Sequence, residues 1–240
     1  MNIEELSIPI KQDIEDQSLE ILEKIASNII VIGGWAVRAH LGEEHHRYTL
    51  DVDGVTDERT LQNLRKLFES SEFEERPVEW GVKFFKRYIP RIETDDDIES
   101  RVELRIELSH PRIKERNTHH YFEFSLTDFE EIYIPYHNID KQVKVRVPPL
   151  EHMTAVKLGM PVDYKHNHDA AMLLRNSDID KVIQVIKSND DWQDIVLRRM
   201  PKLKGRITQP GRIENTLAIA SGLDIRKHIG LLEKIENDLM

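Results

Sequence analysis

The stretch of sequence that decides the fold is GGWAVRAHLGEEHHRYTLDVD, residues 33–53. Two adjacent glycines, Gly33 and Gly34, precede a short helical pattern, and a strand then carries two acids one residue apart, Asp51 and Asp53. Residues two apart in a strand point to the same face, so these carboxylates would lie roughly 6 to 7 Å apart along the chain. At an effective dielectric of about 20 their repulsion is on the order of 2 to 3 kcal/mol, which favours a bound cation if the pair is partly buried.

The glycine pair suits an anionic ligand, because a glycine backbone can approach a ligand closely and the amides that open a helix lack partners. Carboxylate oxygens suit Mg²⁺ or Mn²⁺, which commonly bind one or two carboxylates together with substrate phosphates. Taken alone, the glycines could form a tight turn and the acids could face solvent. Together they predict a phosphate cradle beside a metal-binding pair of aspartates.

A third carboxylate is expected from the strand pattern RVELRIELSH, residues 101–110, in which apolar residues alternate with Glu103, Arg105 and Glu107. We prefer Glu107, with Glu103 as the alternative. A third carboxylate can complete a two-metal site and accept the proton of an attacking hydroxyl. An amphipathic edge strand with cross-strand Glu–Arg pairs is the competing interpretation.

Outside this region, apolar spacing predicts a helix before the strand NIIVI and another helix over residues 57–71, with Asp57 as its N-cap. Further strands of one sheet are expected at 78–89, 101–110, 120–126 and 143–148, with an exposed loop at 93–100. Beyond Pro148 the pattern is helical, with breaks at Pro161, Pro201 and Gly211. The predicted class is α+β: a mixed β-sheet core flanked by helices (residues 1–148), followed by a C-terminal helical bundle (residues 149–240).

The composition of the 240 residues excludes several classes of protein. No apolar run approaches the roughly 20 residues that span a bilayer, and the absence of cysteine excludes disulfides and thiolate chemistry. We therefore expect a cytoplasmic protein without membrane contact. The net charge of −10 argues against general binding of nucleic acid. Residues 192–212 nevertheless contain six basic residues and one acid, which could form a surface for a phosphate-bearing partner or a solvated helix end and loop.

Several motifs in order give the sequence a family resemblance. VIGGWAVRAH, RYTLDVD, RIELSH, VPPLEHMTAVKLGM and KHNHDAAMLL resemble the nucleotidyltransferase superfamily with DNA polymerase β type folds. The likeness is closest to the abortive-infection type nucleotidyltransferase toxins and the aminoglycoside nucleotidyltransferases. The resemblance implies that Gly33 and Gly34 hold a nucleotide triphosphate and that Asp51, Asp53 and Glu107 bind the metals.

The same resemblance assigns roles to three further residues. Lys157 matches the family lysine that contacts the nucleotide phosphates, and Asp169 matches an acid that some members use near the substrate. Arg47 occupies the position of an arginine before the aspartate pair, where it could contact phosphate or pair with the acids. A surface position remains the alternative for Lys157.

The leading hypothesis is an enzyme that uses Mg²⁺ or Mn²⁺ to move a nucleoside monophosphate from an NTP to a hydroxyl acceptor such as tRNA, a protein or a small molecule. One alternative is a catalytically degenerate module that binds a nucleotide or RNA. Another is a toxin restrained by an antitoxin-like partner. Histidine pairs at 45/46, 119/120 and 166/168 raise the idea of zinc, but adjacent residues seldom reach one metal, so surface or hydrogen-bonding roles are expected.

Overall fold

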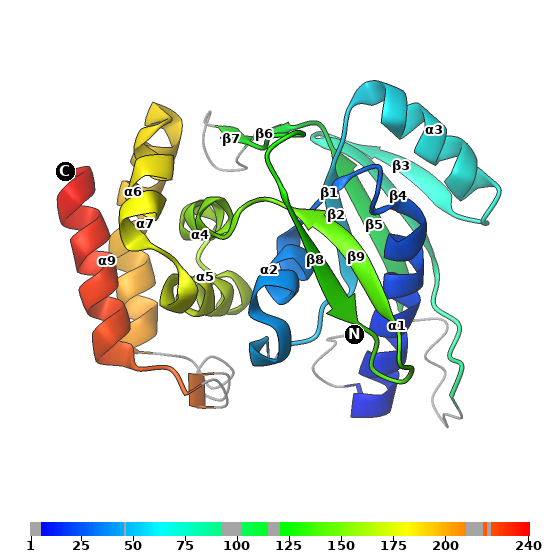
Figure 1. Cartoon of the computed structure of the whole chain (residues 1–240), viewed down its shortest axis with the longest axis horizontal. Helices are drawn as coiled ribbons and strands as arrows, with labels where there is room; N and C mark the ends of the chain where they lie inside the picture. Colours follow the sequence, from blue (N-terminus) through cyan, green and yellow to red (C-terminus); the bar gives the residue numbers. More distant parts are fainter. Residues whose placement is uncertain (1–5, 46, 93–101, 115–120, 210–217, 220–221) are drawn as a thin grey trace. The chain divides into compact units, whose positions relative to one another are not determined.

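The computed structural model describes residues 6–45, 47–92, 102–114, 121–209, 218–219 and 222–240 (Figure 1). The expected loop at 93–100, His46, the pair His119 and His120, and the end of the basic segment at 210–212 lie outside the described residues. The chain divides into two compact units, which are described separately. The sheet unit comprises Met1–Ala39, Tyr48–Pro111 and Phe124–Pro148, and the helical unit comprises His40–Arg47, Arg112–Glu123 and Pro149–Met240.

The sheet unit contains a five-stranded mixed sheet in the order β1-β2-β5-β4-β3 (Figure 1). Its strands are β1 (Ile30–Ile32), β2 (Asp51–Val55), β3 (Glu74–Val78), β4 (Gly81–Arg87) and β5 (Glu103–Ser109). β2 and β5 run parallel, while the other neighbours are antiparallel. The predicted mixed sheet with flanking helices is therefore confirmed.

Helices α1 (Ile8–Ile25) and α3 (Glu58–Glu69) cover one face of this sheet. Phe68 of α3 packs on Phe84 of β4, with ring centroids 4.6 Å apart. Tyr88, which follows β4 and points to the same side as Phe84, donates a hydrogen bond of 2.6 Å to Asp13 of α1. Asp57 caps α3 by accepting a hydrogen bond from the Thr60 amide, as predicted. The apolar side chains on this face of the sheet therefore pack against the two helices.

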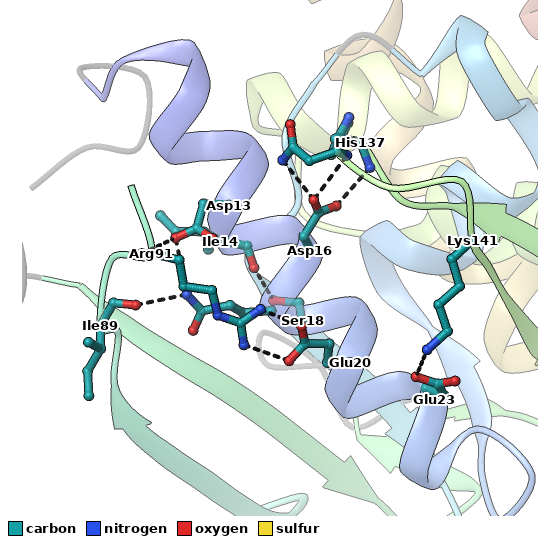
Figure 2. Close-up of polar contacts among 12 residues, drawn as sticks. Asp13, Ile14, Asp16, Ser18, Glu20, Glu23, Ile89, Arg91, His137 and Lys141 are labelled. Atoms are coloured by element: carbon teal, nitrogen blue, oxygen red, sulfur yellow. Dashed lines mark hydrogen bonds and ion pairs between the residues drawn. The ribbon is translucent and has the colours of Figure 1, made fainter. Parts of the chain in front are cut away.

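Acidic side chains of α1 bind the loops around it (Figure 2). Asp13 also accepts a hydrogen bond of 3.1 Å from the Arg91 amide, beyond the end of β4. Asp16 accepts hydrogen bonds from the His137 amide at 2.8 Å and from the Asn138 side chain at 2.8 Å. Further along the helix, Glu20 pairs with Arg91 and Glu23 pairs with Lys141 (Figure 2). Asp13 and Asp16 thus accept hydrogen bonds from part-buried backbone amides, and Glu20 and Glu23 pair with side chains of the same loops.

Two expectations about the strands are wrong. The strands were expected in one sheet, but β6 (Arg112–Lys114) pairs only with β7 (Tyr121–Glu123), and β8 (Glu130–Pro135) pairs only with β9 (Gln142–Val147), among the described strands. The segment 78–89 was expected as one strand, but it contains the end of β3, the turn of the β3–β4 hairpin at Glu79 and Trp80, and β4, which begins at Gly81. Gly81 has a φ of +156°, and a Cβ there would come within 2.1 Å of the Leu108 carbonyl oxygen. Strand β3 is largely charged and exposed, so it lacks the apolar alternation that reveals a strand.

The helical unit contains α4 (Leu150–Gly159), α5 (Tyr164–Asn176), α6 (Ile179–Lys187), α7 (Asp190–Thr208) and α9 (Ile225–Leu239), and helices α6, α7 and α9 pack side by side (Figure 1). Asp163, Asp178, Asn189 and Asp224 cap the starts of α5, α6, α7 and α9. Within the described residues, no helix combines the length and apolar character that a membrane span needs.

The predicted break at Pro201 is wrong, because α7 continues through this proline to Thr208. A proline inside a helix costs about 3 kcal/mol through its missing amide and its ring. Leu203 and Ile207 lie beyond the proline and are buried. Each such side chain contributes about 1.5 to 3 kcal/mol on burial, so continuing the helix offsets the cost of the proline.

Candidate active site

Strand β2 carries the two aspartates on the face of the sheet that α1 and α3 leave uncovered. Val52, between them, is fully buried, while Asp51 and Asp53 are half-buried. This alternation follows from the two-residue period of a strand, because one face of β2 packs into the core. The two carboxylates are therefore held on one side of one rigid strand.

Strand pairing extends this acidic face across the sheet. The parallel register sets Asp53 opposite Glu107 and Asp51 opposite Arg105, and the antiparallel β4 sets Lys83 opposite Glu107. Residues paired across neighbouring strands point to the same face. Asp53, Glu107 and Lys83 thus form one row across three strands, and Asp51 lies in the next row.

The two candidates for the third acid differ in their surroundings. Glu103 pairs with Arg105 of its own strand at 3.1 Å, and its side chain is 43% exposed. Arg87 of β4 lies opposite Glu103. The pairing of β5 with β2 begins at Arg105, so Glu103 is not paired with a residue of β2. Glu107 is 23% exposed and lies directly beside Asp53 in the register. The geometry therefore favours Glu107 over Glu103.

Gly33 joins this row through its backbone. It is the first residue of α2 (Gly33–Leu41), directly after β1, and Gly34 is the second. Gly33 has a φ of +66°, and a Cβ there would lie 2.1 Å from Oδ2 of Asp53. The Asp53 carboxylate is therefore in contact with the opening residue of α2, where the helix dipole favours negative charge. The sequence indicated close approach of a ligand at this glycine, and the structure adds close approach of the Asp53 carboxylate.

Glu107 is held by a lysine. Its Oε1 atom accepts a hydrogen bond of 3.1 Å from Nζ of Lys83, and the two side chains are 23% and 19% exposed. Over the described part of the chain, no group of three or more His, Asp or Glu side chains is arranged to hold a metal ion. A Mg²⁺ ion needs fewer protein ligands, because it keeps waters and takes substrate phosphates. The carboxylate pair of β2 fits such an ion in donor chemistry.

The other predicted site residues gather in the helical unit around Asp169 of α5. Arg47 binds this carboxylate with two hydrogen bonds, Nε to Oδ1 at 2.7 Å and Nη2 to Oδ2 at 2.6 Å. Lys157 of α4 donates to Oδ2 at 2.8 Å, and Nε2 of His45 lies 3.7 Å from Oδ1. We call these four residues the Asp169 cluster. Two cationic side chains and one histidine thus surround one fully buried carboxylate.

The charges of the Asp169 cluster shift the ionisation of its members. Burial alone would raise the pKa of Asp169, but Lys157 and Arg47 hold it well below its usual range. Burial lowers the pKa of the neighbouring His166 from 6.5 to about 4, and the charge of Lys157 adds to this effect. At neutral pH, Asp169 is therefore charged and the neighbouring His166 is neutral. Within the cluster, the two cationic side chains of Arg47 and Lys157 face the one carboxylate of Asp169, so positive charge exceeds negative charge.

Comparisons with known proteins bear on the fold. No family model and no curated protein matches the sequence. Among solved structures, a proposed nucleotidyltransferase from H. pylori is similar over 98% of this chain and 97% of its own, with 13% identity and a TM-score of 0.53. JHP933 from Helicobacter pylori has the same coverage, 15% identity and a TM-score of 0.51.

The antibiotic-resistance factor ANT(2″)-Ia matches more distantly, over 75% of this chain and 91% of its own, with 12% identity and a TM-score of 0.48. The two Helicobacter structures show that this chain shares their fold over nearly its full length, which confirms the predicted fold class; at 13% and 15% identity they leave activity open.

Proposed function

We propose that the protein is an enzyme that transfers a nucleoside monophosphate from an NTP to a hydroxyl acceptor with the help of Mg²⁺ or Mn²⁺. The observation that carries this proposal is the acidic face of the sheet: Asp51 and Asp53 on β2, in register with β5 and Glu107, beside the glycine that opens α2. In a chain with this fold, that arrangement has the donor chemistry that nucleotidyl transfer requires.

In the proposed reaction the acceptor oxygen forms a bond to the α-phosphorus of the NTP. The bond from that phosphorus to the oxygen bridging the β-phosphate breaks, and pyrophosphate leaves. Asp51 and Asp53 would hold the divalent ion, which would neutralise phosphate charge and stabilise the entering and leaving oxygens. Glu107 would help to hold the ion and accept the proton of the acceptor hydroxyl.

Two groups of residues, one within each unit, have the chemistry to bind a phosphate. Gly33 and Gly34 open α2, where unpaired amides and the helix dipole favour an anion. The Asp169 cluster supports a similar role for Lys157 and Arg47, because its buried positive charge exceeds its negative charge and a phosphate would balance it. Asp169 would then orient the two cationic side chains.

For the acceptor we propose three classes: RNA such as tRNA, a protein, or a small molecule. Arg198, Lys202 and Arg206 are exposed at four-residue intervals along α7, so they form one basic stripe that favours an acceptor with phosphates of its own. With a cellular RNA or protein as acceptor, we further propose a toxin-type activity in the cytoplasm that an antitoxin-like partner restrains.

The test is transfer of radioactive label from α-³²P NTPs, with Mg²⁺, to tRNA, cell protein or aminoglycosides. The wild type should label one acceptor class, and Asp51→Asn should abolish the labelling. Asp57→Asn is the matched control, because Asp57 is an exposed N-cap two residues beyond β2 and asparagine caps helices equally well. Equal labelling by the wild type and Asp51→Asn would refute the proposal.

The second candidate function is a binding module without turnover. The pairing of Glu107 with Lys83 favours it, because this pairing removes one carboxylate from metal binding. Calorimetric titration with NTP separates the two functions. An enzyme of the proposed kind should bind NTP more tightly when Mg²⁺ is present, whereas a degenerate module should bind NTP equally with and without the ion and label no acceptor.

A further inference from the structure

Lys83 is a cation placed within the row of acids. Its position opposite Glu107 is fixed by the register of β4 with β5, and Glu107 in turn lies opposite Asp53. Lys83 and Glu107 are 3.1 Å apart and largely shielded from water. Two neighbouring basic residues are engaged elsewhere: Arg76, opposite Lys83 on β3, lies over the ring of Phe85, and Arg105 pairs with Glu103. Lys83 is therefore the cation that contacts the preferred third acid.

We propose that Lys83 is a built-in counter-ion that holds Glu107 while the site lacks a metal ion and releases it when a divalent ion binds. This inference rests on the proposed function, because it concerns the same ion. It explains how three carboxylates can share one face without an ion, since the ammonium group offsets one of them.

Electrostatics gives the direction of the exchange. A Mg²⁺ ion binds carboxylate oxygens at about 2.1 Å, whereas Lys83 and Glu107 are separated by 3.1 Å. The ratio of charge to distance is about threefold larger for the ion, so the ion draws Glu107 away from the lysine. The lysine nevertheless competes, so the free protein should bind the ion more weakly than the carboxylates alone would. Lys83 is thus a positioning residue that acts through Glu107.

The control for this proposal lies on the same strand. Lys86 is three residues from Lys83, so its side chain points to the opposite face, where Nζ lies 4.7 Å from the ring centroid of Phe73. Lys83→Met and Lys86→Met therefore each remove one positive charge from β4, but only Lys83→Met removes a contact with an acid of the row. Lys83→Arg keeps a cation that can hold Glu107.

The experiment measures Mn²⁺ binding to the full chain by electron paramagnetic resonance, without nucleotide. Lys83→Met should bind Mn²⁺ on the order of tenfold more tightly than the wild type, whereas Lys86→Met and Lys83→Arg should not bind it more tightly. In the Glu107→Gln background, Lys83→Met should have little further effect, because the lysine acts through this glutamate.

Three results would overturn the proposal. The first is equal Mn²⁺ affinity of Lys83→Met and the wild type, which would leave the proposed function intact. The second is an equal gain in affinity with and without Glu107, which would mean that Lys83 acts only through its long-range field. The third is no Mn²⁺ binding by the wild type or by Lys83→Met, which would overturn this proposal; if Mn²⁺ also fails to bind when NTP is present, the proposed function fails with it.

Discussion

Replacing Gly33 with alanine should damage the proposed active site far more than the fold. The φ of +66° costs an alanine about 1 to 2 kcal/mol relative to glycine. The new Cβ would also lie 2.1 Å from Oδ2 of Asp53, although Cβ contacts under 3.0 Å are essentially never seen. The carboxylate must therefore move by about 1 Å, and a displacement of that size can cost about 100-fold in rate.

Gly42→Ala supplies the matched control. Gly42 has a φ of +56°, and a Cβ there would meet nothing within 4 Å. Both variants should lose a similar 1 to 2 kcal/mol in free energy of unfolding, measured in urea, from the backbone alone. Only Gly33→Ala should lose about 100-fold in nucleotide transfer, measured with saturating NTP and Mg²⁺. If the two variants transferred nucleotide at similar rates, the contact between Gly33 and Asp53 would not matter to the site.

Three further predictions concern stability, each measured by urea unfolding. Asp169→Asn leaves two buried cationic side chains without their carboxylate, so the free energy of unfolding should fall by about 3 to 5 kcal/mol; a loss under about 1 kcal/mol would contradict the buried pairing. His166 has a pKa of about 4 in the folded protein, against 6.5 ordinarily, so between these pH values only the unfolded chain takes up the proton. Stability should therefore fall by about 3 kcal/mol from pH 7 to pH 4 on account of this residue, and His166→Gln should flatten that part of the profile; an unchanged profile would refute the shift. Asp16→Ala removes the acceptor for the turn after β8 and should cost about 1 to 3 kcal/mol, whereas Glu23→Ala, in an exposed pair, should cost less than about 1 kcal/mol; equal losses would contradict the anchoring role of α1.

Local features of the structure follow from the sequence because their causes are local. Asp57 caps α3 because an aspartate before a helical pattern can reach the amides of the first turn. Asp51 and Asp53 share a face because successive side chains of a strand point to opposite faces. The order of strand, helix and strand around Gly33 follows from the same kind of periodicity.

Features that depend on distant residues could not be predicted in this way. The sequence favoured Gly33 for ligand contact, but only the pairing of β1 with β2 brings the Asp53 carboxylate against it. Arg47 and Asp169 are 122 residues apart, so neither identifies the other as its partner. The lysine that holds Glu107 was missed for the same reason, although a cation in the adjacent apolar-rich segment 78–89 was the available signal.

The central claim is that the carboxylates of β2 and β5 hold a divalent ion together with an NTP. A crystal structure with Mn²⁺ and a non-hydrolysable NTP analogue tests it most directly, because anomalous scattering locates the ion. The account predicts Mn²⁺ about 2.1 Å from oxygens of Asp51 and Asp53 and of the triphosphate, with Glu107 turned from Lys83 toward the ion. Nucleotide bound elsewhere, or bound beside aspartates that contact no ion, would contradict it.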